Sequence, residues 1–125
     1  MRLRGIFSGL VKTRSQGISS HADFIRLVEK ERCRVDRNDH HYSLLVFNLD
    51  LEEIPAHQLQ KFIQKIRQRL RNIDEIGWYA EKKLGIILPY TTRTGAEKLA
   101  GEICAMIEPP SGCTACDVYS YSSQE

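Results

Sequence analysis

The sequence lacks the features that identify several classes of protein. No apolar run approaches the ~20 residues that a membrane-spanning helix needs. The 18 Lys and Arg residues nearly balance the 16 Asp and Glu residues, and a net charge of +2 does not by itself indicate nucleic-acid binding. No G-x-S-x-G sequence, phosphate-binding P-loop or dinucleotide fingerprint is present. What remains is the composition of an ordinary globular domain, with 42% apolar and 27% charged residues.

The first 20 residues differ in composition from the rest of the chain. Their charged residues are all basic (Arg2, Arg4, Lys12 and Arg14), and their short apolar stretch is interrupted by glycine and serine. We therefore expect a flexible basic arm over residues 1–20 rather than a signal peptide, followed by a single domain over residues 21–125. Without a secretion signal, the four cysteines are expected to be reduced thiols in the cytoplasm.

Hydrophobic periodicity predicts three helices. Ser20 is the expected N-cap of the first helix, with Asp23 three residues later, and this helix ends near Asn38. The second helix follows Pro55, and the third begins near Thr92. The apolar residues expected to face inward from the second and third helices are Leu59, Phe62, Ile63, Ile66, Leu70, Ala96, Leu99, Ala100, Ile103 and Ile107.

Four strands are expected around these helices. The first is almost wholly apolar, as in a strand that is buried on both faces. A four-residue charged turn, Ala80 to Lys83, joins the middle two strands in a hairpin that Pro89 closes. The predicted strands are Tyr42 to Leu49, an aromatic strand with Ile76, Trp78 and Tyr79, Leu84 to Leu88, and Ala115 to Tyr121.

The predicted order of elements is α-β-α-β-β-α-β. After its first helix this is βαββαβ, the ferredoxin-like arrangement, in which helices pack on one face of an antiparallel sheet. The sequence therefore predicts an α+β fold with a ferredoxin-like core and one additional N-terminal helix. Residues expected in the core are Leu45, Phe47, Phe62, Ile66, Ile86, Leu88 and Leu99.

Several motifs in this order resemble a known family. They are SLLVFNLD in the first strand, Asp74 five residues ahead of the hairpin tip, Leu88-Pro89, and T-x-x-x-A-x-x-L-A from Thr92. Together they are similar to the GGDEF, or diguanylate cyclase, domain of the nucleotidyl cyclase superfamily, from about Phe24 to Tyr121. Where that family has Gly-Gly-Asp/Glu-Glu-Phe, this chain has Ala80-Glu81-Lys82-Lys83-Leu84.

The resemblance implies that the active site is degenerate. In the family, glycines at the tip let the backbone approach a nucleotide, and acidic residues help to hold divalent metal. Here the acidic positions are Lys82 and Lys83, the glycines are replaced, and the metal carboxylate at the end of the first strand is Asn48, with Asp50 two positions later. Ammonium groups cannot ligate Mg²⁺, which binds hard oxygen donors. We therefore expect no catalytic residue, no bound metal, no cofactor and no enzymatic activity.

A narrower resemblance suggests a biological setting. The degenerate tip with DEIGWY, LGIILP and the terminal C-D-V-Y-x-Y is similar to GGDEF-like modules found ahead of bacterial sugar transferases in exopolysaccharide operons. This implies a regulatory or protein-interaction domain whose partner is a membrane-associated sugar transferase or other polysaccharide-synthesis machinery, with a homodimer as a further option. The basic arm and the Trp78-Tyr79 hairpin are the expected contact surfaces. Neither nucleic-acid binding nor membrane insertion is expected.

Arg71 and Asp74 match R-x-x-D at the spacing of the family's inhibitory site for cyclic di-GMP. Arginine forms bidentate hydrogen bonds with phosphates or guanine edges, and a carboxylate accepts from guanine N–H groups. Arg67 lies one helical turn before Arg71 and is the candidate for a second arginine contact. The alternative is structural: Asp74 anchors the start of the next strand and Arg71 completes a basic helix end. The sequence leaves both interpretations open.

Three weaker patterns have simpler interpretations. The second helix is basic over residues 57–71, which offers a nucleic-acid-binding alternative, although a solvated helix face without interleaved aromatic residues accounts for it. Cys113-x-x-Cys116 has the spacing of half a zinc site or a redox pair, but no further ligands accompany it. His40-His41 is expected to be a polar turn, and the acidic residues Asp50, Glu52 and Glu53 are expected to be a solvated loop.

Overall fold

The computed structural model describes residues 18–38, 40–49, 54–106 and 113–122. The predicted order of helices and strands is confirmed, with one short strand added at the start. The elements are β1 (Ile18–Ser19), α2 (His21–Asn38), β2 (His41–Leu49), α3 (Ala56–Arg69), β3 (Glu75–Ala80), β4 (Lys83–Pro89), α4 (Arg93–Cys104) and β5 (Cys113–Ser122).

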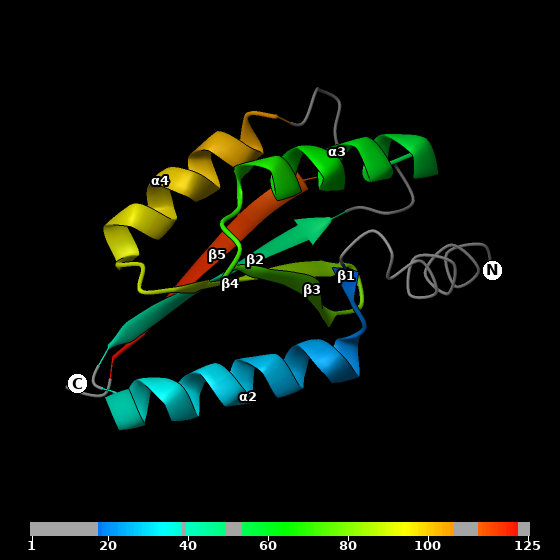
Figure 1. Ribbon diagram of the computed structural model, residues 1–125. Helices are drawn as coiled ribbons and strands as arrows, with labels where there is room; N and C mark the ends of the chain where they lie inside the picture. Colours follow the sequence, from blue (N-terminus) through cyan, green and yellow to red (C-terminus); the bar gives the residue numbers. More distant parts are fainter. Residues whose placement is uncertain (1–17, 39, 50–53, 107–112, 123–125) are drawn as a thin grey trace.

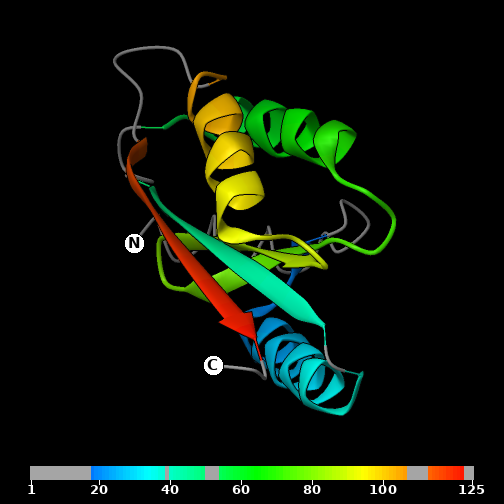
Figure 2. The same ribbon diagram turned by 90° about the vertical axis from the view of Figure 1, so that its left-hand side faces the viewer.

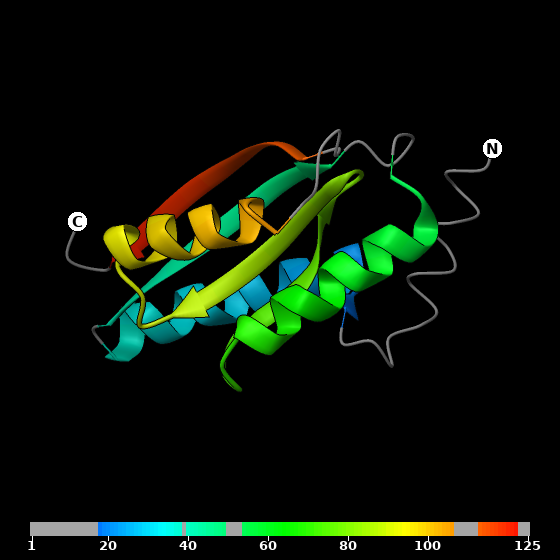
Figure 3. The ribbon, with the colours of Figure 1, turned by 90° about the horizontal axis from the view of Figure 1, so that it is seen from above.

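The strands form one sheet in the order β1-β3-β4-β2-β5 (Figure 1). The pairs β3–β4, β4–β2 and β2–β5 are antiparallel, and only the short β1 runs parallel to its neighbour β3. The last four strands with α3 and α4 are the predicted ferredoxin-like βαββαβ core. Helices α3 and α4 cover one face of the sheet and α2 covers the other, as the side and top views show (Figures 2 and 3).

The sheet is buried on both faces because successive side chains of a strand point to opposite sides. One core lies between the sheet and helices α3 and α4, and a second lies under α2. The buried β2 run therefore contributes to both, as its lack of polar alternation predicted. The larger core includes Leu45, Phe47, Phe62, Ile66, Trp78, Ile86 and Leu88, and the smaller includes Phe24, Val35, Tyr42, Leu44, Val46 and Ile87.

The helix starts follow the local chemistry of the chain. The backbone N–H of Asp23 donates to Ser20 Oγ at 3.2 Å, which confirms the predicted cap of α2. Thr92 caps α4 in the same way by accepting from the N–H of Gly95. Pro55 occupies the N-cap of α3, where the absence of an N–H group costs nothing.

Three sequence-based expectations need correction. Ile18 and Ser19 belong to the sheet rather than to the arm, and the Ile18 side chain is part of the larger core. The hairpin turn is tighter than expected, because Ala80 and Lys83 pair with each other and leave only two residues between the strands. Most importantly, Trp78 is fully buried, so it cannot serve as a contact surface.

Of the remaining expectations, some can be compared with the structure and others cannot. Leu99 packs against the larger core but is only partly buried. Ile107 and residues 1–17 of the basic arm lie outside the described residues. In the part of the chain that the structure describes, no helix has both the length and the apolar character to cross a bilayer.

A close approach between α2 and the hairpin requires two glycines. Gly77 and Gly85 face each other across β3 and β4, and the Phe24 ring of α2 lies directly over them. A Cβ atom added at Gly77 would lie 2.5 Å from Phe24 Cδ1, and one added at Gly85 would lie 2.6 Å from Phe24 Cε2. Both distances are shorter than carbon atoms tolerate, so any larger residue must displace the ring.

We expect Gly85→Ala to destabilise the protein by about 1–3 kcal/mol, the cost of overpacking a core. The smaller, ring-free side chain of Phe24→Leu should relieve the clash, so the double variant should lose less stability than the two single variants added together. Urea unfolding followed by circular dichroism measures both quantities. Gly101→Ala is the control, because a Cβ atom there meets nothing within 4 Å. A Gly85→Ala protein as stable as the parent would contradict this account of the packing.

Candidate functional site

The hairpin tip is held against the end of β2. Glu81 and Lys82 form the turn, and Lys82 adopts a left-handed backbone conformation with φ 64°. The Lys82 carbonyl accepts from the N–H of Leu49 at 2.9 Å, which ties the tip to the end of β2. A lysine is held in a conformation that glycine adopts more easily.

Two of the residues that the resemblance singled out are in direct contact. Asn48 and Lys83 are partners across β2 and β4, and the Lys83 ammonium donates to Asn48 Oδ1 at 2.6 Å. The amide oxygen of Asn48 therefore already accepts from a cation of the same protein. The structure therefore places Asn48 against the Lys83 ammonium and the Lys82 carbonyl beside Leu49 at the end of β2.

The oxygen donors around the tip that belong to described residues do not suit a divalent cation. Asn48 is neutral and already bonded to Lys83, and the exposed Glu81 is the one carboxylate of the turn. Asp50, Glu52 and Glu53 lie outside the described residues. Among the described residues, no group of three His, Cys, Asp or Glu side chains could hold a metal ion. Mg²⁺ binds best to several hard oxygen atoms, whereas the described residues at this site present it with the positive charge of Lys83.

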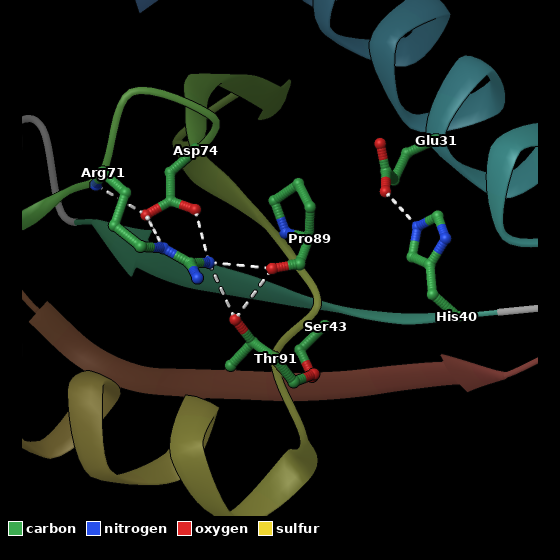
Figure 4. A network of polar contacts seen from close by, with 7 residues as sticks. All are labelled: Glu31, His40, Ser43, Arg71, Asp74, Pro89 and Thr91. Carbon is green, nitrogen blue, oxygen red and sulfur yellow. Dashed lines mark hydrogen bonds and ion pairs between the residues drawn. The ribbon is translucent and has the colours of Figure 1, made fainter. Parts of the chain in front are cut away.

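Arg71 and Asp74 form a closed network at the base of the hairpin (Figure 4). Asp74 Oδ2 accepts from the backbone N–H of Arg71 at 2.8 Å, and Arg71 Nη2 donates to Asp74 Oδ1 at 2.8 Å. The same nitrogen also donates to the Pro89 carbonyl and to Thr91 Oγ1. The pair therefore links the loop between α3 and β3 to the end of β4, and Arg71 lies beyond the last residue of α3 rather than in its basic end.

The two members of this pair differ in accessibility. The Asp74 side chain is only 3% exposed, whereas the Arg71 side chain is 50% exposed. Burial raises the pKa of the adjacent Glu75, and the charge of Lys30 acts in the opposite direction. Arg67, the proposed helper, is exposed on α3 and makes no contact with the network among the described residues. A ligand at this site would find a half-exposed guanidinium and an occupied carboxylate.

The sequence-based reading missed one polar contact between α2 and the sheet. His40 Nε2 lies 3.0 Å from Glu31 Oε2, and both side chains are almost completely buried. The His40 ring also stacks on Tyr90, with ring centroids 4.1 Å apart (Figure 4 shows the His40–Glu31 pair). Glu31 lies seven residues after Phe24 and four before Val35, so helical periodicity alone places it on the buried face.

The structure describes the side chain of only one member of the cysteine pair. Both residues lie on β5, and the Cys116 side chain is partly buried against the larger core. The Cys113 side chain is outside what the structure describes. The spacing therefore stays a sequence observation.

Comparisons with known proteins identify the fold. No model of a known protein family matches the chain, and no curated protein does. Solved structures do match. The GGDEF domain of FimX from Pseudomonas aeruginosa superposes with a TM-score of 0.75 at 8% identity, over 88% of this chain and 79% of that one. The chain therefore has the fold of GGDEF domains.

Two further solved structures carry the same fold with other molecules bound. The GGDEF domain of DgcB from Caulobacter crescentus, in complex with c-di-GMP, has a TM-score of 0.61 at 12% identity, over 86% of this chain and 73% of that one. The diguanylate cyclase SiaD from Pseudomonas aeruginosa, in complex with its activator SiaC, has a TM-score of 0.63 at 12% identity. The match covers 95% of this chain and 54% of that one. At such identities the similarity establishes the fold.

We expect Asp74→Ala to destabilise the protein by about 1–2 kcal/mol, because it leaves the Arg71 N–H and guanidinium without their buried acceptor. Half of the Arg71 side chain is solvated, so the cost stays below that of breaking a fully buried pair. Glu97→Ala removes an exposed ion pair to Arg93 on α4 and should cost less than about 0.5 kcal/mol. Equal losses for the two variants in urea unfolding would show that the network has no special structural role.

Proposed function

We propose that this protein is a non-catalytic regulatory or protein-interaction domain built on the diguanylate cyclase fold. The observation that carries the proposal is the hydrogen bond from the Lys83 ammonium to Asn48 Oδ1. It lies where the resembled family uses carboxylates to hold metal. Replacing a carboxylate by an amide removes a charge, and the added ammonium repels any divalent cation that approaches.

The proposed setting is bacterial exopolysaccharide synthesis, with a membrane-associated sugar transferase or a related protein as the partner. Complex formation between SiaD and its activator supports the general idea that a domain of this fold binds a protein partner. We place the domain in the cytoplasm, a reducing compartment that suits the exposed cysteines Cys33 and Cys104. Glycosyltransferase or polysaccharide-export genes beside the coding sequence would support this setting, and neighbouring genes for nucleic-acid enzymes would oppose it.

We expect purified protein incubated with GTP and either Mg²⁺ or Mn²⁺ to form no cyclic dinucleotide above the level without protein. Chromatography of the reaction mixture measures the product, and an active diguanylate cyclase serves as the positive control. The rival hypothesis is a metal-dependent enzyme that uses Asn48 and Asp50 in another way. It requires turnover of GTP that Asp50→Ala abolishes, and such turnover would refute the proposal.

A second candidate function is binding of cyclic di-GMP without synthesis. The half-exposed guanidinium of Arg71, held in place by Asp74, favours it, because a positioned arginine is suited to phosphate and guanine recognition. The complex of DgcB with c-di-GMP supports the same idea for this fold. The Asp74 carboxylate must then change partners, since it already accepts from Arg71 in the structure.

We expect calorimetric titration with cyclic di-GMP to separate the two roles of Arg71. If the ligand binds there, Arg71→Ala should weaken binding by on the order of a hundredfold, which corresponds to the free energy of one charged bidentate contact. Arg67→Ala leaves the Arg71–Asp74 network intact and reports on the helper alone. Unfolding curves of both variants control for loss of fold. Absence of binding heat at high micromolar ligand would retire this candidate.

A further inference from the structure

Helix α3 presents a surface that the proposed function does not yet use. From Ile54 to Ile73 the chain contains no acidic residue. The apolar side of α3 is buried in the larger core through Leu59, Phe62, Ile63 and Ile66. The opposite side is exposed, and we call it the α3 face, consisting of Gln60, Lys61, Gln64, Lys65, Arg67 and Gln68.

The side chains of the α3 face lie in rows along the helix. Gln60, Gln64 and Gln68 are four residues apart, so they follow one another at about 6 Å along the helix axis. Lys61 and Lys65 flank this row on one side and Arg67 flanks it on the other. A row of neutral amides is thus bordered by positive charge over the whole helix, which is about 21 Å long.

The cations of the α3 face have no acidic partner in the described part of the chain, unlike several arginines on α2 and α4. On α2, Arg26, Arg32 and Arg34 each pair with an acid three residues earlier, and on α4 Arg93 pairs with Glu97. At the end of α3, Arg69 pairs with Glu102 and Arg71 with Asp74. Lys61, Lys65 and Arg67 form no ion pair with any described residue, so their charge is available to a partner.

We propose that the α3 face docks an acidic helical segment of a partner protein. A helix with carboxylates four residues apart repeats them at the same ~6 Å as the rows of the α3 face, so each cation can meet an acid while the glutamine amides donate between them. This inference rests on the proposed interaction function and specifies the chemistry of its partner. The chain's own first 17 residues are not the occupant, because their charged residues are all basic.

Two other occupants fit less well. A bilayer surface binds helices that insert apolar side chains, and those of α3 are committed to the core. Nucleic acid is disfavoured by the net charge of only +2, and single strands also require aromatic stacking groups, which the α3 face lacks. A single helix–helix contact is smaller than a stable interface, so we expect micromolar affinity that falls as salt rises.

The test uses a fluorescein-labelled, alanine-rich peptide of about 20 residues, long enough to be helical, with Glu at every fourth position. Fluorescence anisotropy measures its binding to the full chain at low and high salt. Lys61→Glu/Lys65→Glu/Arg67→Glu should weaken binding more than tenfold. The matched control, Lys30→Glu/Arg37→Glu/Lys98→Glu, makes the same charge change at exposed sites on α2 and α4 and should change binding less than twofold.

Equal loss in the two triple variants would overturn the proposal, because it would show attraction to overall charge. Absence of peptide binding at millimolar concentration would also overturn it. So would tighter, α3-dependent binding of duplex DNA or of phosphatidylglycerol vesicles. If the triple glutamate variant of the α3 face does not fold, the charge-neutral Lys61→Gln/Lys65→Gln/Arg67→Gln variant takes its place. The GTP assay on the same preparation separates the two proposals. A protein that neither turns over GTP nor binds the peptide would contradict only this inference and leave the proposed function in place.

Discussion

The close packing of Phe24 on Gly77 and Gly85 is the contact on which the arrangement of the sheet depends. It brings α2 against the hairpin and leaves the opposite face of β3 and β4 for the larger core. The same hairpin is fixed at its tip by the bond from Leu49 N–H to the Lys82 carbonyl and at its base by Arg71. Three separate contacts therefore hold the hairpin in place, and none of them requires a nucleotide or a metal ion.

This independence means that the fold does not rely on the chemistry of the hairpin tip. The cores consist of aliphatic and aromatic side chains whose packing depends on volume and periodicity. Asn48, Lys82 and Lys83 lie at the end of β2 and at the turn, outside most of that packing. The two lysines are accommodated there because their side chains are only partly buried and the Lys83 ammonium makes a hydrogen bond.

Much of the fold could be predicted from local patterns. The steps of three and four in α3, the apolar run of β2, the cap at Ser20 and the start of α4 near Thr92 are all short-range signals, and each is confirmed. What could not be predicted depended on contacts distant in sequence. Strand β1 exists because Ile18 finds a place beside Ile76, and Trp78 is buried because β3 turns that side of the strand toward α3 and α4.

The candidate site shows the same limit. Pattern matching placed Asn48, Lys82 and Lys83 at one site, but only strand register shows that Asn48 and Lys83 face each other. R-x-x-D is equally compatible with a ligand site and an internal pair, and the burial of Asp74 depends on how the loop folds against Pro89 and Thr91. Glu31 was overlooked because a charged residue on a buried helix face is read as solvated unless its partner, here His40, is known.

The contact between Asn48 and Lys83 also limits what a single substitution can change at this site. An acid at position 48 alone would convert the hydrogen bond into an ion pair and hold the ammonium more firmly. An acid at position 83 alone would set one carboxylate against a neutral amide, with Lys82 still adjacent in the turn. Neither substitution brings together, among the described residues, the several hard oxygen donors that a divalent cation binds, so a cation site there requires more than one change.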